Sequence, residues 1–210
     1  MNKLGDLSCN EFLTELASAA PAPGGGGGAA MAGALAAALA SMVANLTVGK
    51  EKFADLEPEV KELLEQAEAE RVRLLTLVDE DAAVFNSFMS CYKLPKTTDE
   101  EKAARTAAIR AAAKQAATVP LNIARSSFAV LKLADRLVVS GNPGVITDGA
   151  CSGLLARAVL RCAEYNVRIN LGLTKDEEWN AHVAAELVQL LTEAETLENR
   201  LLAVTDKALQ

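Results

Sequence analysis

The sequence predicts an all-α protein, a bundle of about six or seven helices with no sheet. Half of the 210 residues are hydrophobic but only 4% are aromatic, so alanine and leucine must supply most of the packing. Such a composition favours helix over strand. Apolar residues recur at helical spacing, and no segment keeps the two-residue alternation of a strand. Because the length suits one compact domain, we expect residues 1–210 to form a single helical domain.

A turn rich in proline and glycine separates the first two expected helices. Ser8 and Glu11 have the spacing of a capping box, which predicts a helix that begins at Ser8 and ends before Pro21. Five consecutive glycines lead into a second helix, expected over about 29–48. This helix contains almost only small or apolar residues, and we expect it to be buried on all sides at the centre of the bundle.

Prolines and capping residues divide the next part of the chain. Residues 50–55 form a polar connection, and Pro58 suits the first turn of a long helix that reaches about Tyr92. The stretch 94–96 breaks that helix. A second capping box at 98–101 then opens the next one.

Pro120 leaves two alternatives for the following segment. The helix opened at 98–101 continues to about Thr118, and Pro120 either kinks it or starts another helix that reaches Ser140.

A turn at 141–144 precedes the last two expected helices. Thr147 or Asp148 should cap the first of them, which reaches about Asn170. A third capping box, at 174–177, should open the last helix.

Charge and cysteine usage narrow the class of protein. The net charge of −7 argues against a general nucleic-acid surface. With one histidine and no pair of cysteines at CxxC spacing, no zinc set is recognisable and we expect no metal. Reduced thiols and an N-terminus without an apolar signal core favour a cytoplasmic protein. The cysteines are Cys9, Cys91, Cys151 and Cys162.

A membrane span is the alternative for residues 29–48, which form a 20-residue window without charge. Nearly half of the window is alanine, and it lacks flanking aromatic anchors. A buried helix of a soluble protein is therefore the favoured interpretation.

Asp81 is the sharpest chemical anomaly. It falls within a stripe of apolar side chains on the long third helix, and a carboxylate there must be paired, hydrogen-bonded or protonated. Burial would raise its pKa toward neutrality, which suits a group that exchanges protons. An ion pair with Arg105 or Arg125 is the structural alternative, and spacing alone does not decide between the two. Asp79 points to another side of the helix.

Other polar and glycine positions carry weaker signals. The turn at 24–28 would offer free backbone N–H groups at a helix start, or it is simply a flexible entry; it matches neither a P-loop nor GxGxxG. The turn at 141–144 with Asp148 resembles an ordinary cap. Lys50 and Lys96 stand at element ends, where they meet an anionic ligand or, as most lysines do, only solvent. The single histidine, His182, argues against a nucleophilic triad.

Several of these stretches together resemble the cyclodeaminase/cyclohydrolase family. The PAPGGG turn at 21–26 and the alanine-rich helix that ends at Lys50 carry the first part of the resemblance. The rest lies in LVDEDAAVF at 77–85, KLPK at 93–96, and the Gly141–Asn142 turn with Asp148. VPL at 119–121 and NVRINL at 166–171 complete it.

The resemblance implies an all-helical homodimer that binds a tetrahydrofolate derivative as substrate at or near the subunit interface, without a further cofactor. It implies either hydrolysis of 5,10-methenyltetrahydrofolate to 10-formyltetrahydrofolate or cyclisation of 5-formimidoyltetrahydrofolate with release of ammonia. We favour the cyclohydrolase, because no formiminotransferase segment is attached. A folate-binding bundle without activity is a third hypothesis.

The resemblance also assigns roles. It makes Asp81 the general acid/base and Asp79, Asn142 and Asp148 candidates for holding the pterin or a water. The turn glycines Gly24, Gly25 and Gly26 supply backbone donors, and Lys50 and Lys96 are candidates for the glutamate tail. The family usually has Ser where this chain has Gly27, so a backbone N–H must replace that hydroxyl.

Overall fold

The computed structural model describes residues 3–210, which contain helices and no strand. The predicted all-α class is therefore confirmed. Six α-helices follow one another: α1 Cys9–Leu16, α2 Gly24–Asn45, α3 Glu57–Cys91, α4 Asp99–Ser140, α5 Ile146–Thr174 and α6 Glu177–Ala208. There are also three short 3₁₀ helices: η1 Leu4–Asp6 precedes α1, η2 Glu51–Leu56 precedes α3, and η3 Pro143–Val145 precedes α5.

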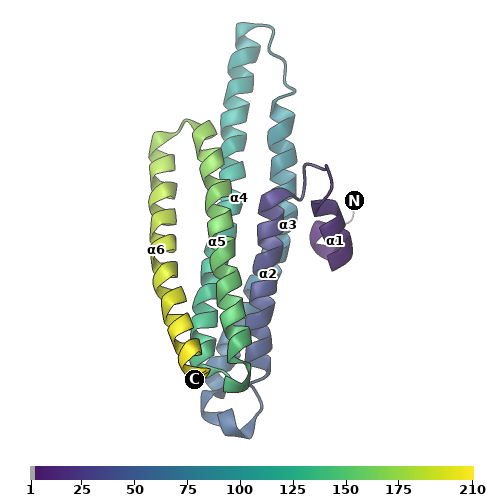
Figure 1. Cartoon of the computed structure of the whole chain (residues 1–210). Helices are drawn as coiled ribbons and strands as arrows, with labels where there is room; N and C mark the ends of the chain where they lie inside the picture. Colours follow the sequence, from purple (N-terminus) through teal and green to yellow (C-terminus); the bar gives the residue numbers. More distant parts are fainter. Residues whose placement is uncertain (1–2) are drawn as a thin grey trace.

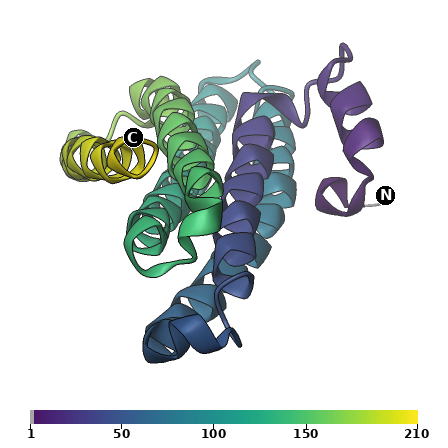
Figure 2. The ribbon, with the colours of Figure 1, turned by 60° about the horizontal axis from the view of Figure 1, so that its bottom comes forward.

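The helices run lengthwise in an elongated bundle (Figure 1). α3 and α4 form the longest hairpin, and its tip extends beyond the ends of α5 and α6. α2 packs against α3 and α5 and also contacts α4, while α6 contacts α4 and α5. Figures 1 and 2 both place α6 at one edge of the bundle and α1 at the opposite edge, beyond α2 and α3.

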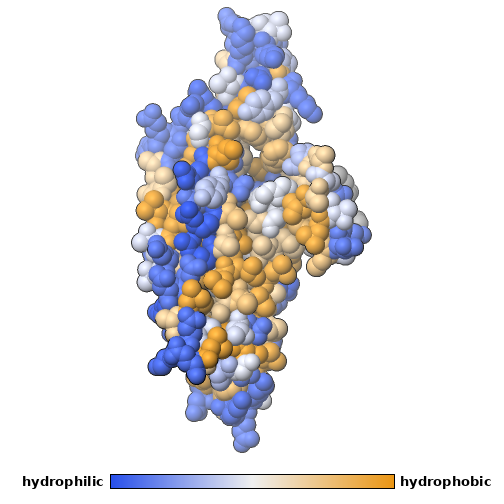
Figure 3. All heavy atoms as spheres, in the orientation of Figure 1, coloured by the Kyte–Doolittle hydropathy of each residue, from blue (hydrophilic) through white to orange (hydrophobic). Residues whose placement is uncertain are grey.

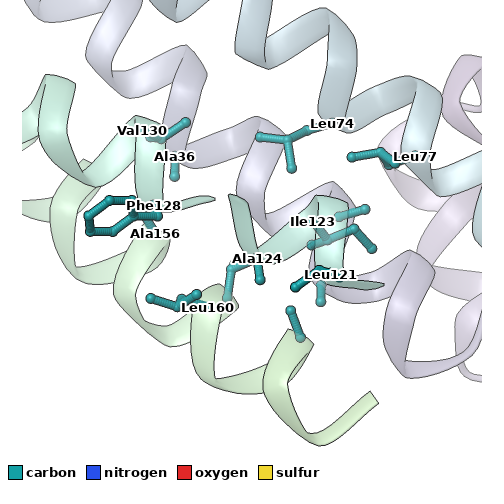
Figure 4. Packing of buried hydrophobic residues seen from close by; sticks show 14 of the residues in the cluster. Ala36, Leu74, Leu77, Leu121, Ile123, Ala124, Phe128, Val130, Ala156 and Leu160 are labelled. Atoms are coloured by element: carbon teal, nitrogen blue, oxygen red, sulfur yellow. The ribbon is translucent and has the colours of Figure 1, made fainter. Parts of the chain in front are cut away.

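The core depends on the small side chains of α2. Ala30, Ala36 and Ala37 have no exposed surface, and their size lets the larger side chains of α3, α4 and α5 approach the α2 backbone closely. These larger residues include Leu74, Leu77, Ile123, Val130 and Leu160 (Figure 4). Removing such a leucine side chain typically destabilises a protein by about 2–5 kcal/mol.

The expectation that α2 is buried on all sides is wrong. Leu35, at its centre, is 55% exposed, because no helix within residues 3–210 covers the outer face of α2. α2 is also long and apolar enough to cross a membrane, but 61% of its most apolar window is buried in the bundle.

The second helix begins earlier than expected, at Gly24 rather than Ala29, and ends at Asn45. All five glycines are helical, although glycine is a poor helix former. Gly24 has a φ of +59°, which L-residues rarely adopt, so the entry to α2 depends on glycine at that position. Contacts with α3 at this end outweigh the low propensity.

Pro120 does not divide the chain: α4 continues through it from Asp99 to Ser140. A proline inside a helix leaves the carbonyl four residues earlier without its N–H donor. Here the Asn170 side chain of α5 donates from Nδ2 to Ala116 O at 2.9 Å and so replaces the missing donor. Tertiary structure thus resolves the two alternatives in favour of one continuous helix.

The capping predictions are partly correct. Ser8 with Glu11 and Thr98 with Glu101 form complete capping boxes. The third expected box does not form, because α5 continues to Thr174 and Asp176 caps α6 by accepting from Trp179 N–H at 3.0 Å.

The start of α5 and the connection after α2 also differ from expectation. Neither Thr147 nor Asp148 caps α5, which begins at Ile146 directly after η3. Asn142 caps η3 instead, by accepting from Gly144 N–H at 3.0 Å. The connection predicted at 50–55 contains the short helix η2.

Candidate active site

A cavity of about 370 Å³ opens at the N-terminal end of α2, where α3, α4 and α5 meet it. Its walls are mainly apolar, and Asp81 is the only titratable residue among those that line it. The lining residues are Pro21, Ala22, Pro23, Gly24, Gly25, Gly26, Asp81, Ala82, Val84, Phe85, Phe88, Ala116, Pro120, Asn166, Ile169, Asn170 and Leu173.

The carboxylate of Asp81 lies directly against the first turn of α2. A Cβ atom placed on Gly26 would stand 2.4 Å from Asp81 Oδ1, so only glycine permits this approach. Gly27 N–H donates to Pro23 O at 3.2 Å and shares this hydrogen with the Asp81 carboxylate. Asp81 therefore lies at the positive N-terminal end of α2, where the N-cap residue Pro23 has no capping side chain.

Burial raises the pKa of Asp81 to about 6, and the hydrogen bond from Gly27 opposes part of that rise. Neither arginine suggested as an ion-pair partner reaches it. Arg105 donates to Tyr92 O, and Arg125 forms an ion pair with Glu186. Over residues 3–210, Asp81 has no ion pair, so no cation there offsets the effect of burial on its pKa.

Asp79 has a different environment from Asp81, as the helical spacing predicted. Its Oδ1 accepts a hydrogen bond of 2.6 Å from Leu4 N–H and so fastens the N-terminal segment to α3. Gly5 lies so close that a Cβ there would be 2.9 Å from Leu75 O. Asp79 does not line the cavity.

The remaining predicted site residues lie in three parts of the molecule: beside the cavity, at the other end of α2, and in the connection between α3 and α4. Gly24, Gly25 and Gly26 line the cavity with Asp81. Lys50 and Asn142 lie at the other end of α2, roughly 30 Å away at 1.5 Å per residue.

At that far end Asn142 joins two segments. Its backbone N–H donates to Thr47 Oγ1 at 2.8 Å, and its Nδ2 donates to Leu46 O at 3.1 Å. Asp148 follows in the first turn of α5.

Lys96 is exposed in the connection between α3 and α4, at the tip of their hairpin (Figure 1).

Sequence reasoning did not assign a role to Asn166 or Asn170, both of which line the cavity from α5. Their four-residue spacing puts them on one face of a helix, and that was the signal available. Ala116 and Pro120 of α4 were missed as well. Which helix they would face could not be read from the sequence.

The described part of the chain contains no obvious metal-binding site. Residues 3–210 contain no group of three or more His, Cys, Asp or Glu side chains that could hold an ion. The four cysteines are all free.

Comparison with known proteins identifies relatives over almost the full length of the chain. The formiminotransferase-cyclodeaminase family matches residues 8–189. A methenyltetrahydrofolate cyclohydrolase from Methylorubrum extorquens is 44% identical over 94% of this chain and 95% of its own length. A formimidoyltransferase-cyclodeaminase from Sus scrofa is 35% identical over 88% of this chain, which spans only 34% of that longer protein.

A solved structure has the same fold. The crystal structure of a formiminotetrahydrofolate cyclodeaminase from Thermotoga maritima superposes with a TM-score of 0.89, covers 99% of this chain and all of its own, and is 30% identical.

Proposed function

Because the chain belongs to the formiminotransferase-cyclodeaminase family, we propose that it is a methenyltetrahydrofolate cyclohydrolase, which converts 5,10-methenyltetrahydrofolate and water to 10-formyltetrahydrofolate. The relative with that activity is the more similar of the two compared and matches nearly end to end. The observation that carries the proposal is Asp81, a carboxylate with a pKa of about 6 in a largely apolar cavity.

The charge of this substrate suits the cavity. In 5,10-methenyltetrahydrofolate the reacting carbon joins two nitrogens and shares a positive charge with them. Among residues 3–210, Asp81 is the only ionisable group that lines the cavity, and Phe85 and Phe88 line the same space. A carboxylate and aromatic rings are both favourable neighbours for a delocalised cation.

In the proposed mechanism Asp81 moves one proton twice. Its carboxylate takes a proton from water as the oxygen attacks the methenyl carbon, which gives a neutral tetrahedral carbinol. The protonated Asp81 then donates to N5 as the bond between that carbon and N5 breaks. The carbinol hydroxyl loses its proton to solvent and becomes the formyl oxygen, so water supplies one proton to N5 and one to solvent. Water and Asp81 are the only reagents needed, and no further cofactor is proposed.

Cyclodeamination is the second candidate, favoured by the similarity to the Thermotoga maritima enzyme. In that reaction N10 attacks the carbon of the formimidoyl group, which reacts as its protonated amidinium form. Asp81 takes the N10 proton and returns it to the departing nitrogen, which leaves as ammonia and gives the methenyl cation. Both reactions pass through a tetrahedral carbon between two nitrogens and need one proton-transferring group at the same place.

Substrate contacts are proposed at both ends of α2. Gly24, Gly25 and Gly26 offer backbone N–H groups beside Asp81. Asp79 lies two residues before Asp81 in α3, outside the cavity lining. Lys50, Lys96, Asn142 and Asp148 remain candidates for the glutamate tail or the pterin. In one chain Lys50, Asn142 and Asp148 lie at the end of α2 far from the cavity, whereas Lys96 lies at the tip of the α3–α4 hairpin.

A homodimer would bring the two ends together. The outer face of α2 is uncharged and apolar, and Figure 3 shows this apolar surface at the centre of the view. It continues onto α5, where Tyr165 is 58% and Ile169 is 71% exposed. Ile169 also lines the cavity. We propose that two copies pair antiparallel across this face, about an axis near Leu35. Lys50 of the partner subunit and Asp148 of the partner subunit would then approach each cavity.

The setting of the reaction is proposed from the same properties. A net charge of −7 and four free cysteines suit a cytoplasmic enzyme that acts on a small molecule. We propose no nucleic-acid or membrane partner.

The test is the ultraviolet absorbance of 5,10-methenyltetrahydrofolate with and without protein near neutral pH, corrected for spontaneous hydrolysis. We expect faster loss of the signal with the protein. If the loss is unchanged but 5-formimidoyltetrahydrofolate gives a gain of the same signal, the enzyme is the cyclodeaminase. If neither changes, the catalytic proposal is wrong and folate binding alone is left.

A further inference from the structure

The α5 wall of the cavity presents two side-chain amides whose orientation is fixed by hydrogen bonds. Asn166 Nδ2 donates to Cys162 O at 2.9 Å. Asn170 Nδ2 donates both to Asn166 O at 2.8 Å and to Ala116 O at 2.9 Å. Because carbonyl oxygens only accept, each amide must turn its NH₂ group toward these partners.

The orientation leaves oxygen atoms for a ligand. Neither Asn166 Oδ1 nor Asn170 Oδ1 accepts a hydrogen bond from any residue of 3–210. A Cβ placed on Gly25 would lie 3.9 Å from the Asn166 amide, whereas one placed on the next residue, Gly26, would collide with Asp81. Asn166 and Asp81 therefore approach the first turn of α2 from two different helices.

The position of Asn170 follows from a defect in α4. Pro120 lacks the N–H that would bond Ala116 O, and a proline ring pushes that carbonyl away from the helix axis. Asn170 meets the displaced carbonyl from α5 and uses its second N–H on the backbone of Asn166. Pro120 thus creates the acceptor that holds Asn170, and Asn170 holds the turn of α5 that carries Asn166.

From this arrangement we infer that Asn166 accepts a hydrogen bond from an N–H group of the reduced pterin, with Asn170 as its positioning residue through Ala116 and Pro120. The inference rests on the proposed function for the identity of the ligand. In this inference Asp81 of α3 supplies the proton-transferring carboxylate. Asn166 of α5 supplies a hydrogen-bond acceptor, which selects a nitrogen heterocycle with N–H donors.

Binding tests the Asn166 contact. Asn166→Ala should weaken the equilibrium affinity for tetrahydrofolate about tenfold, the upper range for one neutral hydrogen bond. It should raise KM similarly while kcat and the midpoint of urea unfolding change little, because the bond involves a part of the substrate that does not react. An unchanged affinity for tetrahydrofolate in an active enzyme would remove Asn166 from the site while the proposed function stands. If the unmodified protein neither turns over folates nor binds tetrahydrofolate, the proposed function fails, and the ligand assigned to Asn166 fails with it.

A double-mutant cycle tests the positioning role without relying on turnover. In the natural background Asn170→Ala should lower the midpoint of urea unfolding and kcat/KM. After Pro120→Ala, the backbone N–H restored at position 120 can bond Ala116 O, and Asn170→Ala should lower the midpoint much less. Asn180→Ala is the matched control, because it removes a side-chain bond to Leu171 O that does not involve Pro120. Its effect should be equal in both backgrounds. Equal effects of Asn170→Ala in the two backgrounds would overturn the link to Pro120.

Discussion

Asp81 illustrates how a single residue is placed in a state that its sequence neighbours do not impose. Its carboxylate is partly buried between α3 and the first turn of α2, where it interacts with Gly27 N–H and with no cation among residues 3–210. Burial raises the pKa by more than the Gly27 hydrogen bond lowers it. The charged form is therefore destabilised in the folded protein, and that same instability makes Asp81 a usable base near neutral pH.

The pH dependence of activity follows from this pKa. The carboxylate acts as a base only when it is ionised, so kcat/KM should rise with pH through about 6 and level off above it. Asp81→Asn should lower kcat at least about 10²-fold. Glu80→Gln, on an exposed neighbour in α3, is the control and should retain full activity.

Stability should change in the opposite direction to activity. The folded protein binds the Asp81 proton more tightly than the unfolded chain, so this group's contribution is present below pH 4 and is lost as pH rises to about 6. Asp81→Asn should consequently stabilise the protein at pH 7.5, on the order of 2 kcal/mol, and have little effect at pH 4. Urea unfolding at both pH values measures the difference. An equal effect at the two pH values would mean that burial of the charge is not its cause.

At the scale of elements, the close approach of α2 and α3 depends on where α2 lacks side chains. Gly26 faces Asp81, Gly33 faces Leu74, and the alanines between them pack against the core. Helix propensity alone would not favour five consecutive glycines in a helix. The glycines are retained in α2 because contact with α3 compensates, and at Gly26 that contact is with Asp81, the proposed catalytic residue.

Gly26→Ala should separate stability from catalysis. Alanine suits the helix better than glycine by about 0.5–1 kcal/mol, but its Cβ would displace the Asp81 carboxylate. A misplacement of about 1 Å can lower the rate about 10²-fold, and we expect a loss of that size in kcat with the helical circular dichroism signal intact. Gly28→Ala is the matched control, because its Cβ would meet only the Leu16 side chain at 3.4 Å. Comparable activity of the two variants would show that the approach to Asp81 is not critical.

At the scale of the molecule, no helix of residues 3–210 covers one side of the bundle. α6 covers α4 and α5, but the outer face of α2 and the adjoining face of α5 have no cover within residues 3–210. The cavity opens at the edge of the same face. A second copy placed there would bury apolar surface and complete the cavity in one step.

Leu35→Glu tests that arrangement. Leu35 is near the midpoint of α2 and is exposed, so a charge there should disrupt a two-fold contact without unfolding the chain. We expect the molar mass measured by light scattering to fall by half and activity to fall with it, because each cavity would lose the partner's residues. Val188→Glu, at a 64% exposed position on α6, should change neither. A monomeric Leu35→Glu protein with full activity would show that one chain suffices.

The sequence alone determined the helical class, the bounds of α3 and α4, the start of α1 and the apolar stripe around Asp81, because these depend on local signals. A capping box is read within four residues, and the apolar stripe of α3 is read from its periodicity. Tertiary structure decided the rest. The continuity of α4 through Pro120 requires Asn170 from a different helix, and the burial of Asp81 requires the close approach of α2 at Gly26. The separation of Asp148 and Lys50 from Asp81 reflects the length of α2 between them. These outcomes depend on contacts between residues about 50 or more positions apart, which no local pattern specifies.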